Sequence, residues 1–311
     1  MSRDNRKKRI ILPRFKDKRG GFLNFADYRK VSNRIGYGVM VAFLILFAFM
    51  AVFPIVFLFA SSMKSVSEIT SATYTFWPKE WDWGKIGRLW ERFDFGRYYL
   101  NTFVYVIGAV ICAVIFNSLL AYAVAIVKPI GYKVINVLVF LGYMVPTILN
   151  IFPLLQEIRD FGFLNPDHQS YLIFIPLWLG FGANAYYYML FRDYFSRLPK
   201  SLVEASSMDG ANQLQIFFRV VLPLSKPIIG IVAIFAMTAS YSDFLLPYCL
   251  LQASELQTVV VGIYNISNIN PPLQLPDFLL LIMLSIIPQI IIFLVFQRQI
   301  MNVGAGKGSK E

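Results

Sequence analysis

Two stretches of the sequence are long enough to cross a membrane and contain no charged residue. Residues 35–63 and 98–127 are uncharged over 29 and 30 consecutive positions. A helix of about 20 apolar residues spans the roughly 30 Å hydrocarbon core of a bilayer. Barrel strands would alternate polar and apolar residues over about ten positions, and these continuous runs do not. The pattern excludes a soluble enzyme and a single-pass anchored domain, and it predicts an all-α polytopic membrane protein.

Charged and turn-forming residues divide the remaining apolar sequence into further spans. The composition agrees, because 57% of the residues are apolar and 15% are charged, against about 45–50% and 25% in soluble domains. We predict a basic N-terminal tail (1–34), a transmembrane domain (35–297) and a C-terminal tail (298–311). The six transmembrane helices predicted within that domain are 35–63, 98–127, 134–156, 169–191, 227–251 and 278–297.

The distribution of lysine and arginine predicts the orientation of these spans. The two tails and the connections at 128–133 and 192–226 carry 22 of these residues, whereas the connections on the other side carry 7. Because basic residues are retained on the cytoplasmic side, we expect both termini in the cytoplasm. The basic tail directly precedes a span, so we interpret it as a segment that rests on anionic membrane lipid and not as a nucleic-acid-binding arm.

The connection at 192–226 is long enough to hold structure of its own. Pro199 favours a helix start, which predicts a helix over 201–208, and Gly210 stands where a left-handed turn would end it. A second helix would begin near 211–212 and stop or kink at Pro223. Its apolar residues recur at spacings of three and four, which predicts an amphipathic face; they are Leu214, Phe217, Phe218, Val221 and Leu222. Spacing alone indicates an interfacial helix pair packed under the bundle.

The residues of this connection add a resemblance to a known family. Glu204-Ala205-Ser206, then Gly210, then Leu222-Pro223 resemble the EAA loop of permease subunits of binding-protein-dependent ABC importers. Ser206 replaces the second alanine of the usual pattern, which is a small-for-small change. Met208-Asp209-Gly210-Ala211 is similar to the carbohydrate branch of the family, which includes the smaller maltose permease subunit.

Other segments extend the resemblance over residues 49–307. They are Phe76-Trp77-Pro78, Tyr99-Leu100-Asn101-Thr102, Ala121-Tyr122-Ala123, Met144-Val145-Pro146, Tyr241–Pro247 and the C-terminal Gln297-Arg298 with Gly304. Tyr241 and Ser242 depart from the pattern, because the family more usually has tryptophan and asparagine there. The basic N-terminal tail lies outside the resemblance.

The resemblance implies a type I ABC importer permease fold and a subunit without a catalytic centre. The implied partners are a second homologous permease, two ATPase subunits that bind ATP and Mg, an extracytoplasmic solute-binding protein and a carbohydrate solute. The implied location is the bacterial cytoplasmic (inner) membrane. The residues implied to couple to the ATPase are Glu204, Ala205, Ser206, Asp209, Gly210, Leu222 and Pro223. Gln297, Arg298 and Gly304 are implied to contact the ATPase from the C-terminus.

Polar and aromatic groups inside the spans are candidates for the solute path. We expect Asn117, Tyr188, Tyr241 and Asp243 to line it. Asp243 is the one acidic residue inside an apolar span, and an intramembrane carboxylate is a functional candidate by default. Leu-Leu-Pro follows it, which favours a helix break. A solute contact, a proton relay and a structural role therefore remain open for this residue.

Several sequence patterns suggest other activities, but their residues do not match what those activities require. The glycine-rich segment 304–309 is expected to be an extended tail, because Met301 and Gly308 occupy positions that a phosphate-binding loop requires to be Gly and Ser/Thr. We therefore expect no cofactor on this chain. His168 and the two cysteines have no partners for metal binding or catalysis. A proton-coupled transporter would need charged residues in several spans, and only Asp243 qualifies. A membrane glycosyltransferase would need an acidic cluster at the membrane face, and the sequence shows none.

Overall fold

The computed structural model describes residues 31–71, 73, 75–163, 171–251 and 255–304, and in these residues all regular structure is helical. The chain divides into two compact units at residues 57 and 58. The first unit holds most of α1 (Val31–Ser62). Its apolar side chains between residues 35 and 57 are largely exposed, as expected of a helix whose solvent is lipid.

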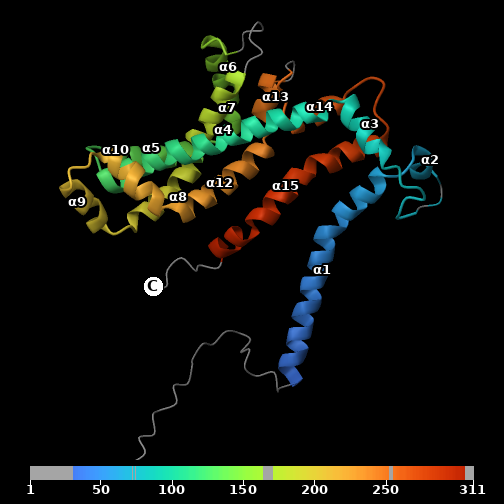
Figure 1. The fold of residues 1–311 in the computed structure, drawn as a ribbon, viewed down its shortest axis with the longest axis horizontal. Helices are drawn as coiled ribbons and strands as arrows, with labels where there is room; N and C mark the ends of the chain where they lie inside the picture. Colours follow the sequence, from blue (N-terminus) through green and yellow to red (C-terminus); the bar gives the residue numbers. More distant parts are fainter. Residues whose placement is uncertain (1–30, 72, 74, 164–170, 252–254, 305–311) are drawn as a thin grey trace, which may run out of the picture. The chain divides into compact units, whose positions relative to one another are not determined.

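The second unit is built around one long helix. The helix α4 (Phe95–Tyr122) continues as the π-helical turn η1 (Ala123–Val127). Its main neighbours are α7 (Phe174–Gly182), α8 (Ala185–Ser196) and α12 (Lys226–Tyr241). Figure 1 shows α8 and α12 running beside it. The predicted second span therefore forms the centre of the helix packing.

Shorter helices connect and complete these elements. On the predicted outer side they are α2 (Val66–Ile69), α3 (Gly84–Arg92), α6 (Ile151–Asp160), η3 (Tyr171–Ile173), α13 (Leu245–Leu251) and α14 (Val259–Ser267). The others are α5 (Tyr132–Met144), η2 (Thr147–Asn150), α9 (Lys200–Met208), α10 (Gln213–Ile216), η4 (Phe217–Val221) and α11 (Leu222–Leu224). The last helix is α15 (Leu275–Gly304).

The helices confirm the all-α polytopic membrane class, although three of the six predicted spans are broken. Continuous apolar helices cover 35–62, 95–127 and 275–297. The third span consists of α5 followed by η2 and α6 after a bend of 96°. Val145 is extended there because it precedes Pro146, and a residue before proline disfavours the helical conformation. The fourth span is α7 and α8, and the fifth is α12 and α13.

Three apolar clusters hold the second unit together. One joins η1, α8, η4 and α12 around Tyr188, Phe191 and Phe217. Another joins α4 to α7 and α13 around Tyr105 and Phe174. The remaining cluster joins α3, α14 and α15. The first of these clusters fixes the segment at 192–226 to the transmembrane helices, and that segment is the candidate site.

Candidate functional site

The first half of the 192–226 connection folds as the sequence predicts. The helix α9 begins directly after Pro199, one residue before the predicted start, and ends at Met208. Gly210 is left-handed, with φ of +81°. The backbone N–H of Gly210 donates to the Ser207 carbonyl at 3.1 Å, and that of Ala211 donates to the Ser206 carbonyl at 3.1 Å. These bonds satisfy carbonyls at the end of α9 and turn the chain into the next helix.

The second half begins with a capping box. The Asn212 side chain accepts the Gln215 backbone N–H at 2.8 Å, and the Gln215 side chain accepts the Asn212 N–H at 2.9 Å. The Tyr122 hydroxyl donates to the Gln213 side-chain oxygen at 2.7 Å. Tyr194 donates to the Leu224 carbonyl at 3.2 Å. The loop is therefore bonded to the ends of α4 and α8.

The predicted single apolar face of this second helix is wrong in part. Phe217 and Val221 are buried as expected, but Leu214 and Phe218 are 62% and 49% exposed. The physical reason is the π-helical turn η4, whose wider turn changes which residues share a face. Ile216 enters the core instead, at 0% exposure. Leu214 and Phe218 are thus outward-facing apolar groups on the loop.

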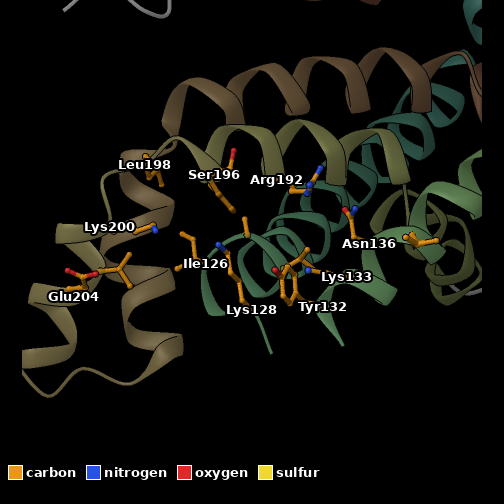
Figure 2. Close-up of a pocket in the computed structure, with 15 residues that line it drawn as sticks. Ile126, Lys128, Tyr132, Lys133, Asn136, Arg192, Ser196, Leu198, Lys200 and Glu204 are labelled. Atoms are coloured by element: carbon orange, nitrogen blue, oxygen red, sulfur yellow. The ribbon is translucent and has the colours of Figure 1, made fainter. Parts of the chain in front are cut away.

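Most of the predicted coupling residues are exposed to solvent. Glu204, Ala205 and Asp209 are exposed, and Leu222 is half-buried. The Ser206 hydroxyl donates to the Leu202 carbonyl at 2.8 Å, so the replacement of the usual alanine leaves no unpaired hydroxyl. Pro223 occupies the first turn of α11, where its missing N–H costs no hydrogen bond. Glu204 also lines a pocket that α9 shares with η1, α5 and α8 (Figure 2). The contact of the predicted coupling residues with an ATPase stays a prediction.

Asn117 and Tyr188, two of the four predicted path residues, each hydrogen-bond a neighbouring helix. Asn117 is buried, and its amide donates to the Ala113 carbonyl at 2.8 Å and to the Phe181 carbonyl at 2.9 Å. The second of these bonds joins α4 to α7. Tyr188 is fully buried, and its hydroxyl donates to the Asn136 side chain at 2.9 Å, which joins α8 to α5.

The other two, Tyr241 and Asp243, lie in the predicted fifth span. The Tyr241 hydroxyl donates to the Ser285 carbonyl at 2.6 Å, and Tyr241 borders an apolar pocket of about 370 Å³ among α4, α12 and α15. Asp243 accepts the Tyr105 hydroxyl at 2.7 Å. It sits between α12 and α13, so the helix break expected there is present. The structure gives each of the four side chains an interhelical or helix-break position, and their contact with a solute stays a prediction.

The last helix runs past residue 297, the predicted end of the sixth span. The helix α15 continues without a break to Gly304. The Gln297 side chain donates to the Leu294 carbonyl of its own helix at 3.0 Å. Arg298 lies on the same helix, but the side chains from residue 298 onward are outside the described part. Residues 305–311, the tail 1–30 and His168 lie outside it as well.

A polar network that the sequence did not indicate holds the predicted outer end of the second unit. Lys85 pairs with Asp277 at 3.0 Å and donates to the Ser62 carbonyl at 2.9 Å. Next to it, Arg88 hydrogen-bonds Asp82 and lowers the pKa of that carboxyl. No local signal could have found the Lys85–Asp277 pair, because its members are far apart in the chain. Within the described residues, no group of three or more His, Cys, Asp or Glu side chains could hold a metal ion.

Comparisons with known proteins place this geometry in a family. Residues 117–301 match the family model described as binding-protein-dependent transport system inner membrane component. The diacetylchitobiose uptake system permease protein NgcG of Streptomyces coelicolor is 28% identical over 271 residues, covering 86% of this chain and 87% of that protein. The melibiose/raffinose/stachyose import permease protein MelC of Bacillus subtilis is 27% identical, with 82% and 91% covered.

A further similar protein and a similar solved structure are named for other solutes. The sn-glycerol-3-phosphate transport system permease protein UgpE of Yersinia pestis is 28% identical over 278 residues, covering 86% of this chain and 96% of that protein. Among solved structures, a bacterial ABC transporter involved in the import of the acidic polysaccharide alginate contains a similar chain. The TM-score is 0.75 and the identity 27%, with 86% of this chain and 98% of that chain covered. The predicted importer permease fold is confirmed.

Proposed function

This chain belongs to the family of binding-protein-dependent transport system inner membrane components, and on that premise we propose that it forms one half of the translocation path of an ATP-driven importer. The chain itself is a multi-pass membrane permease subunit. The solute is an oligosaccharide or a related polyhydroxylated compound. Similar proteins named for diacetylchitobiose, raffinose and alginate import support this class of solute.

The rest of the proposed assembly follows from the permease role. A second homologous permease completes the path, and an extracytoplasmic protein delivers the solute. Two separate ATPase subunits bind ATP and Mg and contact the 192–226 loop from the cytoplasm, the side on which both termini lie. Asn117, Tyr188, Tyr241 and Asp243 lie in or near the solute path. The helix end at Gln297, Arg298 and Gly304 reaches the ATPases.

The observation that carries the coupling role is the attachment of the loop to the transmembrane helices. The short helices α9 and α10 meet at the left-handed Gly210. The Tyr122–Gln213 hydrogen bond fixes α10 to α4, and the Tyr194–Leu224 bond fixes α11 to α8. A rigid-body switch needs an element whose displacement moves its neighbours. A partner that moves this loop would therefore move the central helix α4 and its neighbour α8.

Charge reversal at Glu204 tests whether an ATPase binds the loop. Glu204→Lys should reduce the ATPase retained on affinity-purified permease at least about tenfold, because truncating one partner of a buried charge pair costs about 2–5 kcal/mol. Solute uptake should fall in parallel. The carboxylate is exposed in the isolated chain, so membrane abundance should stay near that of the wild type.

Glu91→Lys is the matched control. Glu91 is also an exposed glutamate, but it lies on α3 in the predicted outer loop, so its reversal should leave ATPase retention unchanged. Wild-type retention and uptake in the Glu204→Lys variant would reject the coupling role and leave the loop as an interfacial helix pair. Uptake that collapses with an ionophore and persists without ATP would instead identify a secondary transporter.

A further inference from the structure

A pocket of about 620 Å³ opens where four elements meet at the 192–226 loop. Its walls come from η1, the start of α5, the end of α8 and the first turns of α9. Figure 2 shows Glu204 at one end of this pocket and Asn136 at the other, with Lys128 and Tyr132 between them. The pocket shares no lining residue with the apolar cavity beside Tyr241. None of the four predicted path residues lines it, although Tyr188 hydrogen-bonds its lining residue Asn136.

The lining of this pocket is strongly basic. Lys128, Lys133, Arg192 and Lys200 line it, and Glu204 is the one acidic residue among its lining side chains. Among the described residues, none of these four cations forms an ion pair. Converging cations with low-dielectric walls concentrate an anion, and Lys and Arg are the usual partners of phosphate oxygens. The pocket therefore favours a phosphate-bearing ligand.

The position of the lysines along the chain places the pocket at the edge of the membrane. Lys128 directly follows the uncharged run 98–127, and Lys133 directly precedes the apolar segment that begins at residue 134. Charged residues that end two neighbouring spans mark the boundary between hydrocarbon and headgroups. A phosphate held between these lysines lies at headgroup depth.

An apolar surface continues from the pocket toward the membrane interior. Val137 lines the pocket and is exposed. The side chains of Val134, Leu138 and Leu141 are exposed on the same helix, α5. Val137 and Leu138 each lie three or four residues from both Val134 and Leu141, so the four side chains share a helix face. Acyl chains could lie along this face while a headgroup occupies the pocket. A soluble phosphate compound would gain nothing from it.

We propose that this pocket binds the phosphate headgroup of an anionic glycerophospholipid, with the acyl chains along α5. Basic pockets at the cytoplasmic ends of transmembrane helices suit such headgroups. Lys200 of α9, Lys128 after η1 and Lys133 of α5 all line the pocket, so a bound headgroup would contact all three elements. The proposal goes beyond the importer function and does not depend on which solute is carried.

Native mass spectrometry of the delipidated full-length chain tests the proposal. Phosphatidylglycerol that is added back should stay bound, whereas added phosphatidylcholine with the same acyl chains should not. Each basic residue near an anionic headgroup changes binding roughly fivefold. The double variant Lys128→Gln/Lys133→Gln should therefore weaken phosphatidylglycerol binding roughly 30-fold, and Lys128→Arg/Lys133→Arg should retain it.

The matched control removes two cations that do not line the pocket. Arg219 and Lys226 are exposed in the same connection, and Arg219→Gln/Lys226→Gln should keep wild-type binding. Equal phosphatidylglycerol binding in both glutamine pairs would overturn the proposal, as would equal retention of phosphatidylcholine. Glycerol phosphate that binds as tightly as phosphatidylglycerol would overturn it too, because the site would then be one for soluble anions. A native-like thermal transition in the Lys128→Gln/Lys133→Gln variant shows that any loss is not due to unfolding.

Discussion

At the scale of single residues, Gly210 determines how the two halves of the loop meet. Its φ of +81° lies in the left-handed region, and no atom lies within 4 Å of the position that a Cβ would occupy. A side chain there would meet open space, so its cost is conformational strain of roughly 1–2 kcal/mol. Gly210→Ala should therefore re-aim α9 against α10 and lower the ratio of solute transported to ATP hydrolysed.

Gly162 provides a closely matched control for that variant. It is left-handed as well, with φ of +78°, and its surroundings are also open. Gly162→Ala carries the same strain but lies at the end of α6, far from the loop in sequence. The transport-to-hydrolysis ratio measured in proteoliposomes should fall for Gly210→Ala alone. Equal ratios in the two variants would remove the special role of position 210.

Substitutions of Asp243, which pairs with Tyr105, can distinguish a structural role of this carboxylate from proton coupling. The Tyr105 hydroxyl donates to the Asp243 carboxylate at 2.7 Å. The amide introduced by Asp243→Asn can accept the same bond but cannot exchange a proton, so ATP-driven uptake should remain within about threefold of wild type. Asp243→Leu removes the acceptor and should reduce uptake further. Loss of uptake in Asp243→Asn equal to that in Asp243→Leu would favour a proton relay.

Which polar residues lie inside spans can be read from the sequence, but the partner of each cannot. The interpretation of Asn117 and Tyr241 as polar groups within helices holds in the structure. On the neighbouring helices, their acceptors are the backbone carbonyls of Phe181 and Ser285. Every residue has such a carbonyl, so the sequence does not show which one accepts the bond. Only the helix packing decides whether such a group faces a neighbouring helix, and no motif encodes that choice.

At the scale of elements, glycines allow α7 to approach the central helix closely, and Gly108 is the most crowded of them. A Cβ on Gly108 of α4 would overlap the ring of Trp178, whose indole donates to the Tyr105 carbonyl at 2.9 Å. Gly108→Ala should destabilise the protein by about 1–3 kcal/mol, the usual cost of overpacking, as measured by thermal unfolding in detergent. Gly180→Ala on α7 is the control, because no atom lies within 4 Å there. Similar melting temperatures for both variants would contradict this packing.

The loop shows which parts of an element can be predicted from local chemistry. Pro199 and Gly210 gave α9 nearly its observed bounds, because start and stop signals are local. The burial of the second helix was not predictable in the same way. Its π-helical turn places Phe217 against Tyr122, with ring centroids 5.3 Å apart. That contact comes from the tertiary packing, which changes the period that sequence spacing assumes.

The continuation of α15 to Gly304 gives the C-terminus a testable role. A helix that leaves the last span can transmit force, whereas an extended tail cannot. Truncation after Arg298 should reduce ATP hydrolysis coupled to uptake without loss of membrane insertion. Truncation after Gly304 keeps the whole helix and should leave hydrolysis near wild type. Normal uptake and hydrolysis in the shorter chain would mean that the helix end makes no functional contact.

At the scale of the whole molecule, the exposed apolar surface reflects a chain that folds in lipid. Most side chains of α1 between residues 35 and 57 are exposed, and α5 has no buried residue. Hydropathy predicted where the spans lie, because it reports the solvent that each segment meets. It could not predict the bend of 96° near Pro146, whose geometry depends on neighbouring helices. The helix break at Asp243 was expected from the Leu-Leu-Pro that follows it, not from hydropathy.

The orientation of the whole chain rests on the charge difference of 22 against 7 basic residues and has a direct test. In a variant with Cys112 and Cys249 replaced by alanine, single cysteines at Ser207 and Asn270 report on opposite sides. Both positions are exposed in the structure. An impermeant maleimide applied to intact cells should label Asn270→Cys and spare Ser207→Cys, while permeabilised cells should label both. Labelling of Ser207→Cys from outside would invert the topology, and the 192–226 loop could then not reach a cytoplasmic ATPase.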